Sequence, residues 1–172
     1  MNFHSFGWCA LGFGCLLLSG CDKPLSPEVA AWRKEFLCDV KPNAPLSLTE
    51  AKGKLQQEND ITVVGKVGSG KLDPFAKGLA QFVLSEAPDG GHADEKGHDA
   101  TECIYCRRRL ADAPLAIIEL RNAAGEVIPV AANEALGISD GQRLVIEGRG
   151  KYDPELNSIL LVAKQVYIES KK

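Results

Sequence analysis

Two histidines and two cysteines lie close together in one stretch of the sequence, and they form its strongest candidate for a chemical site. In "GHDATECIYCRRR", residues 97–109, His98 precedes Cys103 by five positions and Cys106 follows three positions later, while His92 lies six residues upstream of His98. Thiols at positions i and i+3 converge on one tetrahedral ion in zinc ribbons and knuckles, where imidazoles are common further ligands. We therefore expect His92, His98, Cys103 and Cys106 to form a Cys2His2-type metal site.

The ligand chemistry favours zinc, with copper as the second choice. Two thiolates and two imidazoles suit a closed tetrahedral ion without redox chemistry, whereas Cu(I) is favoured by the soft thiolates. The order His-x5-His-x4-Cys-x2-Cys differs from that of a zinc finger, in which the cysteines come first. Acidic neighbours in the same stretch either steer a cation and orient the histidines or simply solvate the loop; they are Asp94, Glu95, Asp99 and Glu102.

The chemistry of these thiols depends on the cellular compartment, and the first 21 residues bear on it. The apolar run there contains no Lys, Arg, Asp or Glu, ends in "LLLSGC", and is too short and Gly-interrupted for a comfortable membrane span. It resembles a bacterial lipoprotein signal with its Leu-x-Gly-Cys lipobox. The resemblance implies removal of residues 1–20, acyl chains such as palmitate on Cys21, and an extracytoplasmic protein anchored to a membrane of the cell envelope. A short uncleaved N-terminal anchor is the alternative.

Asp22 bears on which membrane holds the protein. In proteobacterial lipoproteins an Asp directly after the lipidated Cys favours the inner membrane. In bacteria with other envelopes this rule need not apply, so the outer membrane is the alternative.

The chain carries 20 Lys and Arg against 23 Asp and Glu, a formal net charge of −3, and only 6% aromatic residues. Such a composition offers no excess of basic side chains to bind phosphates and few aromatic rings to stack on bases. Nucleic acid is therefore disfavoured as the main ligand.

Three thiols remain after the predicted signal and lipid anchor, namely Cys38, Cys103 and Cys106. The main alternative to a metal is a Cys103–Cys106 disulfide, either structural or an exchanging dithiol, because extracytoplasmic thiols tend to oxidise. A thioredoxin-type enzyme places its Cys-x-x-Cys at a helix N-terminus in an α/β unit, which the β-rich pattern of this chain argues against. Arg107 excludes a c-type haem motif, which needs His there. Cys38 is either a small buried apolar residue or a partner for a later thiol.

The chain before residue 60 predicts a tether and two helices. A helix begins near Ser26, with Pro27 at the favoured first position. A second helix begins near Ser47, which stands in capping-box spacing with Glu50. We therefore divide the chain into a signal peptide at 1–20, a tether with N-terminal helices at 21–59, and a β domain at 60–172.

From residue 60 onward the hydrophobic period changes from helical to extended. Apolar and β-branched runs predict two strands near 61–68 and 79–87, a third at 115–122, a short helix near 133–137, and two final strands at 143–152 and 158–169. This is the order of elements in an OB-fold, so the chain resembles OB-fold proteins and is expected to be mainly β, with a five-stranded Greek-key barrel. The coiling of such a barrel needs close approaches at glycines; the candidates are Gly65, Gly148 and Gly150.

The candidate metal site lies in the connection between the second and third predicted strands, at about 87–114. Such a length without secondary structure of its own is typical of loops that are functional, cross-linked or disordered. The following run Arg107, Arg108 and Arg109 either binds an anionic ligand at the mouth of the barrel or forms a solvated edge. "GSGK" at 68–71 lacks the flanking residues of a phosphate loop and predicts a turn.

The sequence favours a non-catalytic protein. No Ser-His-Asp or Cys-His arrangement can form without the histidines of the predicted metal site, although His98 could serve as a base for Cys103. "PFAKGLAQFVLSEAP" followed by the His/Cys loop is similar to uncharacterised planctomycete envelope proteins, a resemblance that implies no activity. We expect a membrane-anchored lipoprotein with a zinc site that binds or scaffolds an unidentified protein or small molecule. A thiol-disulfide redox protein and an OB-type module for oligosaccharide or nucleic acid are the alternatives.

Overall fold

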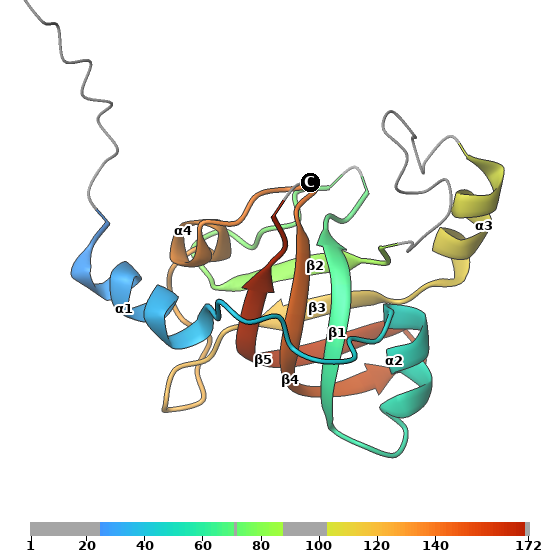
Figure 1. Ribbon diagram of the computed structural model, residues 1–172, viewed down its shortest axis with the longest axis horizontal. Helices are drawn as coiled ribbons and strands as arrows, with labels where there is room; N and C mark the ends of the chain where they lie inside the picture. The colour runs from blue at the N-terminus through green and yellow to red at the C-terminus, as the bar shows by residue number, and fades with distance from the viewer. Residues whose placement is uncertain (1–24, 71, 88–102, 171–172) are drawn as a thin grey trace, which may run out of the picture.

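The computed structural model describes residues 25–70, 72–87 and 103–170. Four helices and five strands follow one another along the chain; they are α1 (Pro27–Phe36), α2 (Leu48–Lys54), β1 (Asp60–Val67), β2 (Gln81–Ser85), α3 (Ile104–Asp112), β3 (Leu115–Glu119), α4 (Ala132–Leu136), β4 (Arg143–Asp153) and β5 (Ser158–Ile168). The protein is therefore mainly β, as the hydrophobic periods predict (Figure 1).

The five strands form one closed barrel in the order β1-β2-β3-β5-β4, with β4 paired to β1. β3 runs parallel to β5, whereas every other neighbouring pair is antiparallel. The short helix α4 lies between β3 and β4 in the chain. This topology confirms the predicted OB-fold-like Greek-key barrel.

The barrel interior is filled by alternate residues of its strands, as the period of two requires. Along β2 the burial pattern alternates strictly between buried and half-buried positions. The largest fully buried side chains include five strand residues that belong to one hydrophobic cluster, Phe82, Leu84, Ile118, Ile146 and Leu161. Helix α2 adds Leu48, Ala51 and Leu55 to that cluster.

Gly148 is the position where the barrel most requires a glycine. The register of β4 against β5 shifts between Glu147 and Gly148, which marks a β-bulge. A Cβ atom at Gly148 would lie 2.3 Å from the carbonyl oxygen of Val162 in β5. The close approach of the two backbones thus explains the glycine that the sequence places there.

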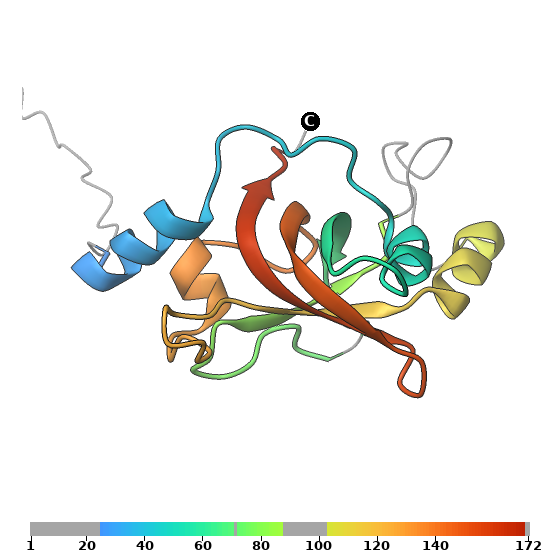
Figure 2. The same ribbon diagram turned by 90° about the horizontal axis from the view of Figure 1, so that it is seen from below.

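The N-terminal helices begin as predicted and are attached to the barrel. Ser26 caps α1 and accepts the N–H of Val29, with Pro27 at the first helical position. Ser47 and Glu50 form the expected capping box of α2. Between the helices the chain runs along the barrel, because Leu37 pairs with Val166 of β5 and Leu46 pairs with Val63 of β1. Figures 1 and 2 show α1 at one end of the molecule and α2 at the other.

Two local predictions need correction. The second strand starts at Gln81 rather than 79, since residues 77–80 form a turn followed by a bend. The connection at 87–114 was expected to lack secondary structure, yet residues 104–112 form α3. Arg, Leu and Ala are good helix formers, and they fill this half of a segment whose first half is rich in Gly.

Candidate metal or dithiol site on helix α3

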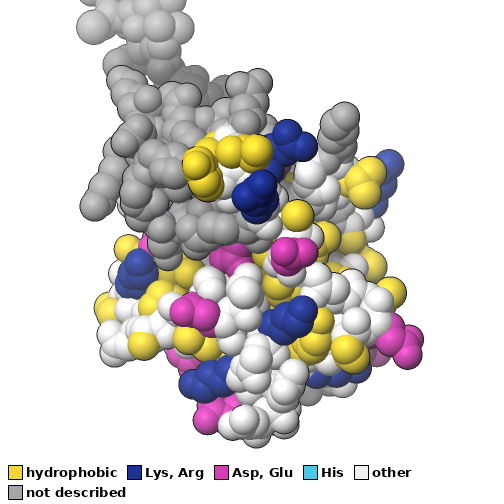
Figure 3. All heavy atoms as spheres, turned by 90° about the vertical axis from the view of Figure 1, so that its right-hand side faces the viewer, with side chains coloured by type: hydrophobic (Ala, Val, Ile, Leu, Met, Phe, Trp, Pro, Cys, Tyr) yellow, Lys and Arg dark blue, Asp and Glu magenta, His cyan; other side chains and the backbone are white. Residues whose placement is uncertain are grey.

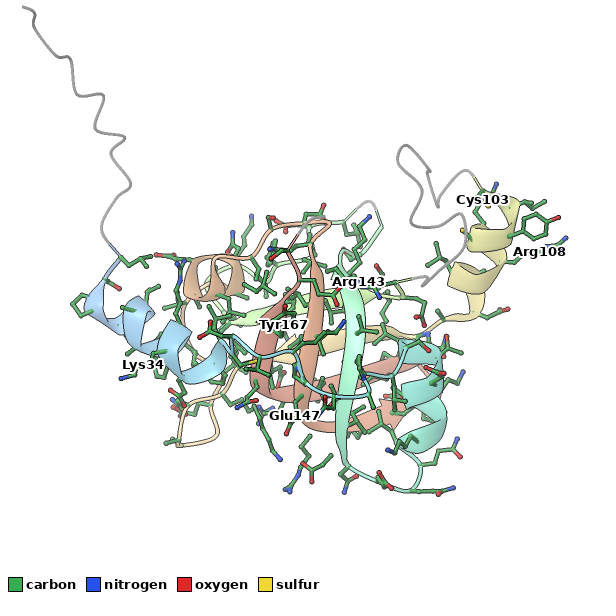
Figure 4. The ribbon with its side chains drawn as sticks, viewed as in Figure 1. Lys34, Cys103, Arg108, Arg143, Glu147 and Tyr167 are labelled. Atoms are coloured by element: carbon green, nitrogen blue, oxygen red, sulfur yellow. The ribbon has the colours of Figure 1, made fainter. Side chains whose placement is uncertain are left out.

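Helix α3 presents the two cysteines of the predicted site at its N-terminal end. Cys103 is the N-cap residue, in an extended backbone conformation and without a side-chain cap hydrogen bond, and its carbonyl accepts the N–H of Arg107 at 2.9 Å. Cys106 lies within the first turn. Residues three apart lie on the same face of a helix, so the two thiols belong to one end and one side of α3. Figure 4 shows Cys103 at the end of α3 that points away from the barrel.

The two thiols differ in exposure. Cys106 is 3% exposed, whereas Cys103 is half-buried. Both are thiols in the structure, as is Cys38, so no disulfide joins cysteines of the described chain. The arrangement offers one accessible sulfur and one buried sulfur at the end of a helix where backbone N–H groups and the helix dipole favour negative charge.

The two predicted histidine ligands, His92 and His98, lie outside the described residues, as do the acidic neighbours at 94, 95, 99 and 102. Within residues 25–70, 72–87 and 103–170 no group of three or more His, Cys, Asp and Glu side chains gathers closely enough to hold a metal ion. The described chain therefore contains half of the predicted ligand set, Cys103 and Cys106, held in a fixed relation by α3.

The helical setting corrects one step of the sequence argument against thiol-disulfide exchange. That argument took the β-rich pattern to exclude both a helix N-terminus and an α/β unit at the Cys-x-x-Cys, but the motif opens a helix of nine residues. The other step holds, because α3 leads into β3 of a closed barrel and not into the strands of an α/β unit. The local geometry thus suits an exchanging dithiol better than the sequence indicated.

Cys38 belongs to a different part of the molecule. It follows α1, and its N–H donates to the carbonyl oxygen of Val166 in β5. Burial raises the pKa of the Cys38 thiol, and the nearby Asp39 carboxylate raises it further. Both causes favour the protonated thiol, which makes Cys38 a poor nucleophile.

The arginine run lies on α3, outside the barrel. Arg107 and Arg108 are exposed, and Arg109 belongs to the same helix. Figure 4 shows Arg108 extending outward from α3. In Figure 3, which views the end of the molecule that carries α2 and α3, apolar and basic side chains lie next to one another above acidic ones. Arg107 and Arg108 therefore form an exposed basic surface on a helix beside the barrel, and an anionic ligand for them stays a prediction.

Sequence reasoning missed a hollow between α2, the end of β2 and α3. Its volume is about 420 Å³, and its walls include Thr49, Glu86 and Arg108. Glu86 is only 5% exposed, which is rare for a glutamate. The sequence gives little indication of this burial, because a single Glu after an apolar strand is normally expected to face solvent.

No helix of the described chain is both long and apolar enough to cross a membrane. The chain matches no protein-family model and none of the curated proteins with which it was compared.

Proposed function

We propose that this protein is a lipid-anchored protein of the cell envelope that binds or scaffolds a partner without catalysis, and that a zinc ion secures the segment before β3. The ion would be held by Cys103 and Cys106 together with His92 and His98. A single observation carries the metal proposal: α3 places Cys103 at its N-cap and Cys106 one turn later, without anchoring its described side chains in the barrel core. The proposed partner is an unidentified protein or small molecule.

A bound ion would matter for α3 because so short a helix has little stability of its own. A helix of nine residues is marginal in water unless tertiary contacts stabilise it. Its N-cap Cys103 makes no side-chain cap hydrogen bond, and Ile104 and Tyr105 are 58% and 68% exposed. A closed tetrahedral ion would add stabilisation at this end of the helix. Copper is the second choice for the ion because thiolates also bind Cu(I).

Metal analysis of the full chain tests the proposal. Protein purified in detergent without a chelator or a histidine tag should contain about one zinc per chain, with zinc–sulfur distances of about 2.3 Å and zinc–nitrogen distances of about 2.0–2.1 Å by X-ray absorption. Cys103→Ser, Cys106→Ser and His98→Ala should each lose most of the metal. Cys38→Ser is the matched control and should keep it. Metal-free protein, or equal metal in all four variants, would refute the site.

Lipid anchoring needs its own experiment because it is independent of the metal. The motif "LLLSGC" supports acylation of Cys21. Cells labelled with a palmitate analogue should give a labelled protein, and Cys21→Ala should abolish the label. Label that persists in Cys21→Ala would exclude the lipobox interpretation, while leaving the metal proposal unaffected.

A dithiol function is the second candidate, favoured by the unequal exposure of the two thiols. Accessible Cys103 would attack a sulfur of a substrate disulfide, and buried Cys106 would then displace the mixed disulfide, so that the substrate leaves as a dithiol and the protein as a disulfide. Insulin reduction by the dithiothreitol-reduced protein distinguishes the two functions. Turnover that is abolished by Cys103→Ser and insensitive to zinc chelation supports the dithiol, whereas absence of turnover in metal-free protein rejects it.

A further inference from the structure

The hollow at the α2–α3 end of the barrel contains a buried carboxylate oxygen that lacks a donor. Glu86 follows β2 and lies with its side chain against the start of α2. Its Oε2 atom accepts two hydrogen bonds from Thr49, one from the backbone N–H at 2.9 Å and one from the hydroxyl at 2.8 Å. Its Oε1 atom is buried and receives no hydrogen bond from the residues that the structure describes.

An acceptor in that situation is energetically costly, particularly when it carries charge, because it has lost its hydration without gaining a donor. Glu86 lines the hollow of about 420 Å³, so a molecule that enters the hollow can supply the missing donor. The volume lies within the range of small-molecule pockets, roughly 300–1,000 Å³.

The charged side chains around the hollow indicate which charge a bound ligand should carry. Among the described side chains three carboxylates line it, those of Glu50, Glu86 and Asp112, against the guanidinium of Arg108, and Glu50 is engaged by Ser47 in the capping box. Arg108 is exposed and extends outward from α3, so it stands at the rim (Figure 4). The interior therefore favours a cation. Because the described side chains form no group of three potential metal ligands, an organic cation with N–H donors fits better than a metal ion.

We propose that this hollow binds the ammonium or guanidinium group of a small organic cation, and that Glu86 Oε1 accepts a hydrogen bond from it. Charge-assisted hydrogen bonds between such groups and a carboxylate are the strongest that side chains form. Asp112 adds attraction from the edge of the hollow, while Arg108 opposes the cation. The proposal rests on Glu86 and Thr49, which lie outside α3, and its argument uses neither zinc nor the lipid anchor nor dithiol chemistry.

Two probes of the same shape test the charge requirement, namely butylguanidinium and the neutral butylurea. The full chain in detergent is titrated with each probe, and the backbone amide signal of Thr49 is followed by NMR. Butylguanidinium should shift that signal in a saturable way at millimolar concentrations, and butylurea should bind at least tenfold more weakly. Equal binding of both probes, or no response to butylguanidinium, would overturn the proposal.

Variants then locate the binding. Glu86→Gln keeps one oxygen for Thr49 and replaces the other acceptor by an NH2 group, so butylguanidinium affinity should fall at least tenfold. Asp112→Asn should lower it by a smaller factor, and Arg108→Ala should raise it. Glu134→Gln, on α4 at the other end of the barrel, is the matched control and should leave affinity unchanged. Should Glu86→Gln fail to fold, the opposite effects of Asp112→Asn and Arg108→Ala decide; unchanged affinity in both would reject the site.

Butylammonium and a short lysine peptide distinguish the sources of the cation. The proposal requires that a free cation the size of butylammonium or butylguanidinium be sufficient. Binding of the peptide alone would refute a small-molecule site and indicate a protein partner instead.

Discussion

Helices α2 and α3 lie at the same end of the molecule and have similar lengths, but they are stabilised in different ways (Figures 1 and 2). Helix α2 has a complete capping box, and it buries Leu48, Ala51 and Leu55 in the barrel core. Helix α3 lacks a side-chain cap at Cys103, and no described side chain of α3 belongs to that core. The barrel core thus stabilises α2 directly, whereas the described side chains of α3 lie outside that core.

The two helices are therefore expected to respond differently to the composition of the surrounding solution. Apolar packing fixes α2 whatever the surrounding solution contains. If two thiols and an ion hold α3, as proposed, its stability responds to metal supply and to oxidation, because both change the thiols themselves. Experiments that perturb the two helices separately therefore test whether the α3 end is an independent unit.

Truncation of the buried core residue of α2 should have the largest effect. Leu48 is 0% exposed, so Leu48→Ala leaves a cavity and should lower the free energy of unfolding by about 2–5 kcal/mol. Ile104→Ala on α3 removes apolar atoms from a side chain that is 58% exposed and should change it by less than about 0.5 kcal/mol. Urea unfolding followed by circular dichroism measures both. A comparable loss in Ile104→Ala would show that α3 unfolds together with the barrel.

Removal of the α2 cap should have an intermediate effect. The hydroxyl of Ser47 accepts the N–H of Glu50 at 3.2 Å, and Ser47→Ala leaves that N–H without its acceptor. Loss of such a cap costs about 1 kcal/mol of stability. The same urea titration should show the decrease for the whole barrel, since α2 packs in the core. Ser139→Ala, an exposed serine outside the helices, is the control. A decrease confined to local hydrogen exchange in α2 would contradict the view that α2 is part of the barrel.

The barrel was predictable because its signals are local and repeated. Alternating apolar residues over 143–152 and 158–169 specify strands, and the order of elements restricts the topology to few choices. The capping residues Ser26 and Ser47 were readable for the same reason, since each cap lies within four residues of the helix that it starts.

The features at the α3 end were less predictable because they depend on distant contacts. Glu86 is buried because Thr49, far away in the sequence, donates two hydrogen bonds to it. No local pattern around Glu86 reports that pairing. Helix α3 was missed because its preceding segment is polar and Gly-rich, a composition that outweighed the helix-forming residues at 107–111. The predicted ligands His92 and His98 lie outside the described residues, so their role stays a prediction.

Loss of one α3 thiol should change local protection and leave the barrel almost unaffected. Cys106→Ser should prevent metal binding and loosen α3, so that trypsin cleaves faster after Arg107 and Arg108, which are exposed. Because the barrel core does not include α3, the free energy of unfolding should change by less than about 0.5 kcal/mol. Mass spectrometry of timed digests measures the cleavage, with Cys38→Ser as control. Unaltered cleavage in Cys106→Ser and after zinc chelation would mean that the thiols do not secure α3.

The smallest effect should come from a surface ion-pair group on the barrel, and it should leave α3 untouched. A hydrogen bond from Lys164 lowers the pKa of the Asp60 carboxyl, with further lowering by the charge of Arg149. A carboxyl with a lowered pKa in the folded protein contributes stability above its unfolded pKa, and loses it as the pH falls through the folded value. The unfolding temperature of Asp60→Asn should therefore lie slightly below that of the wild type near neutral pH, and the difference should disappear once the pH has fallen through the folded-state pKa of Asp60. Added salt should shrink the difference because these side chains are exposed and screened.

Tryptic cleavage after Arg107 should be identical in the wild type and Asp60→Asn, since Asp60 and its partners lie on β1, β4 and β5. A difference that grows on acidification would have the wrong sign for a lowered pKa, and faster cleavage at α3 would mean that the two regions are coupled.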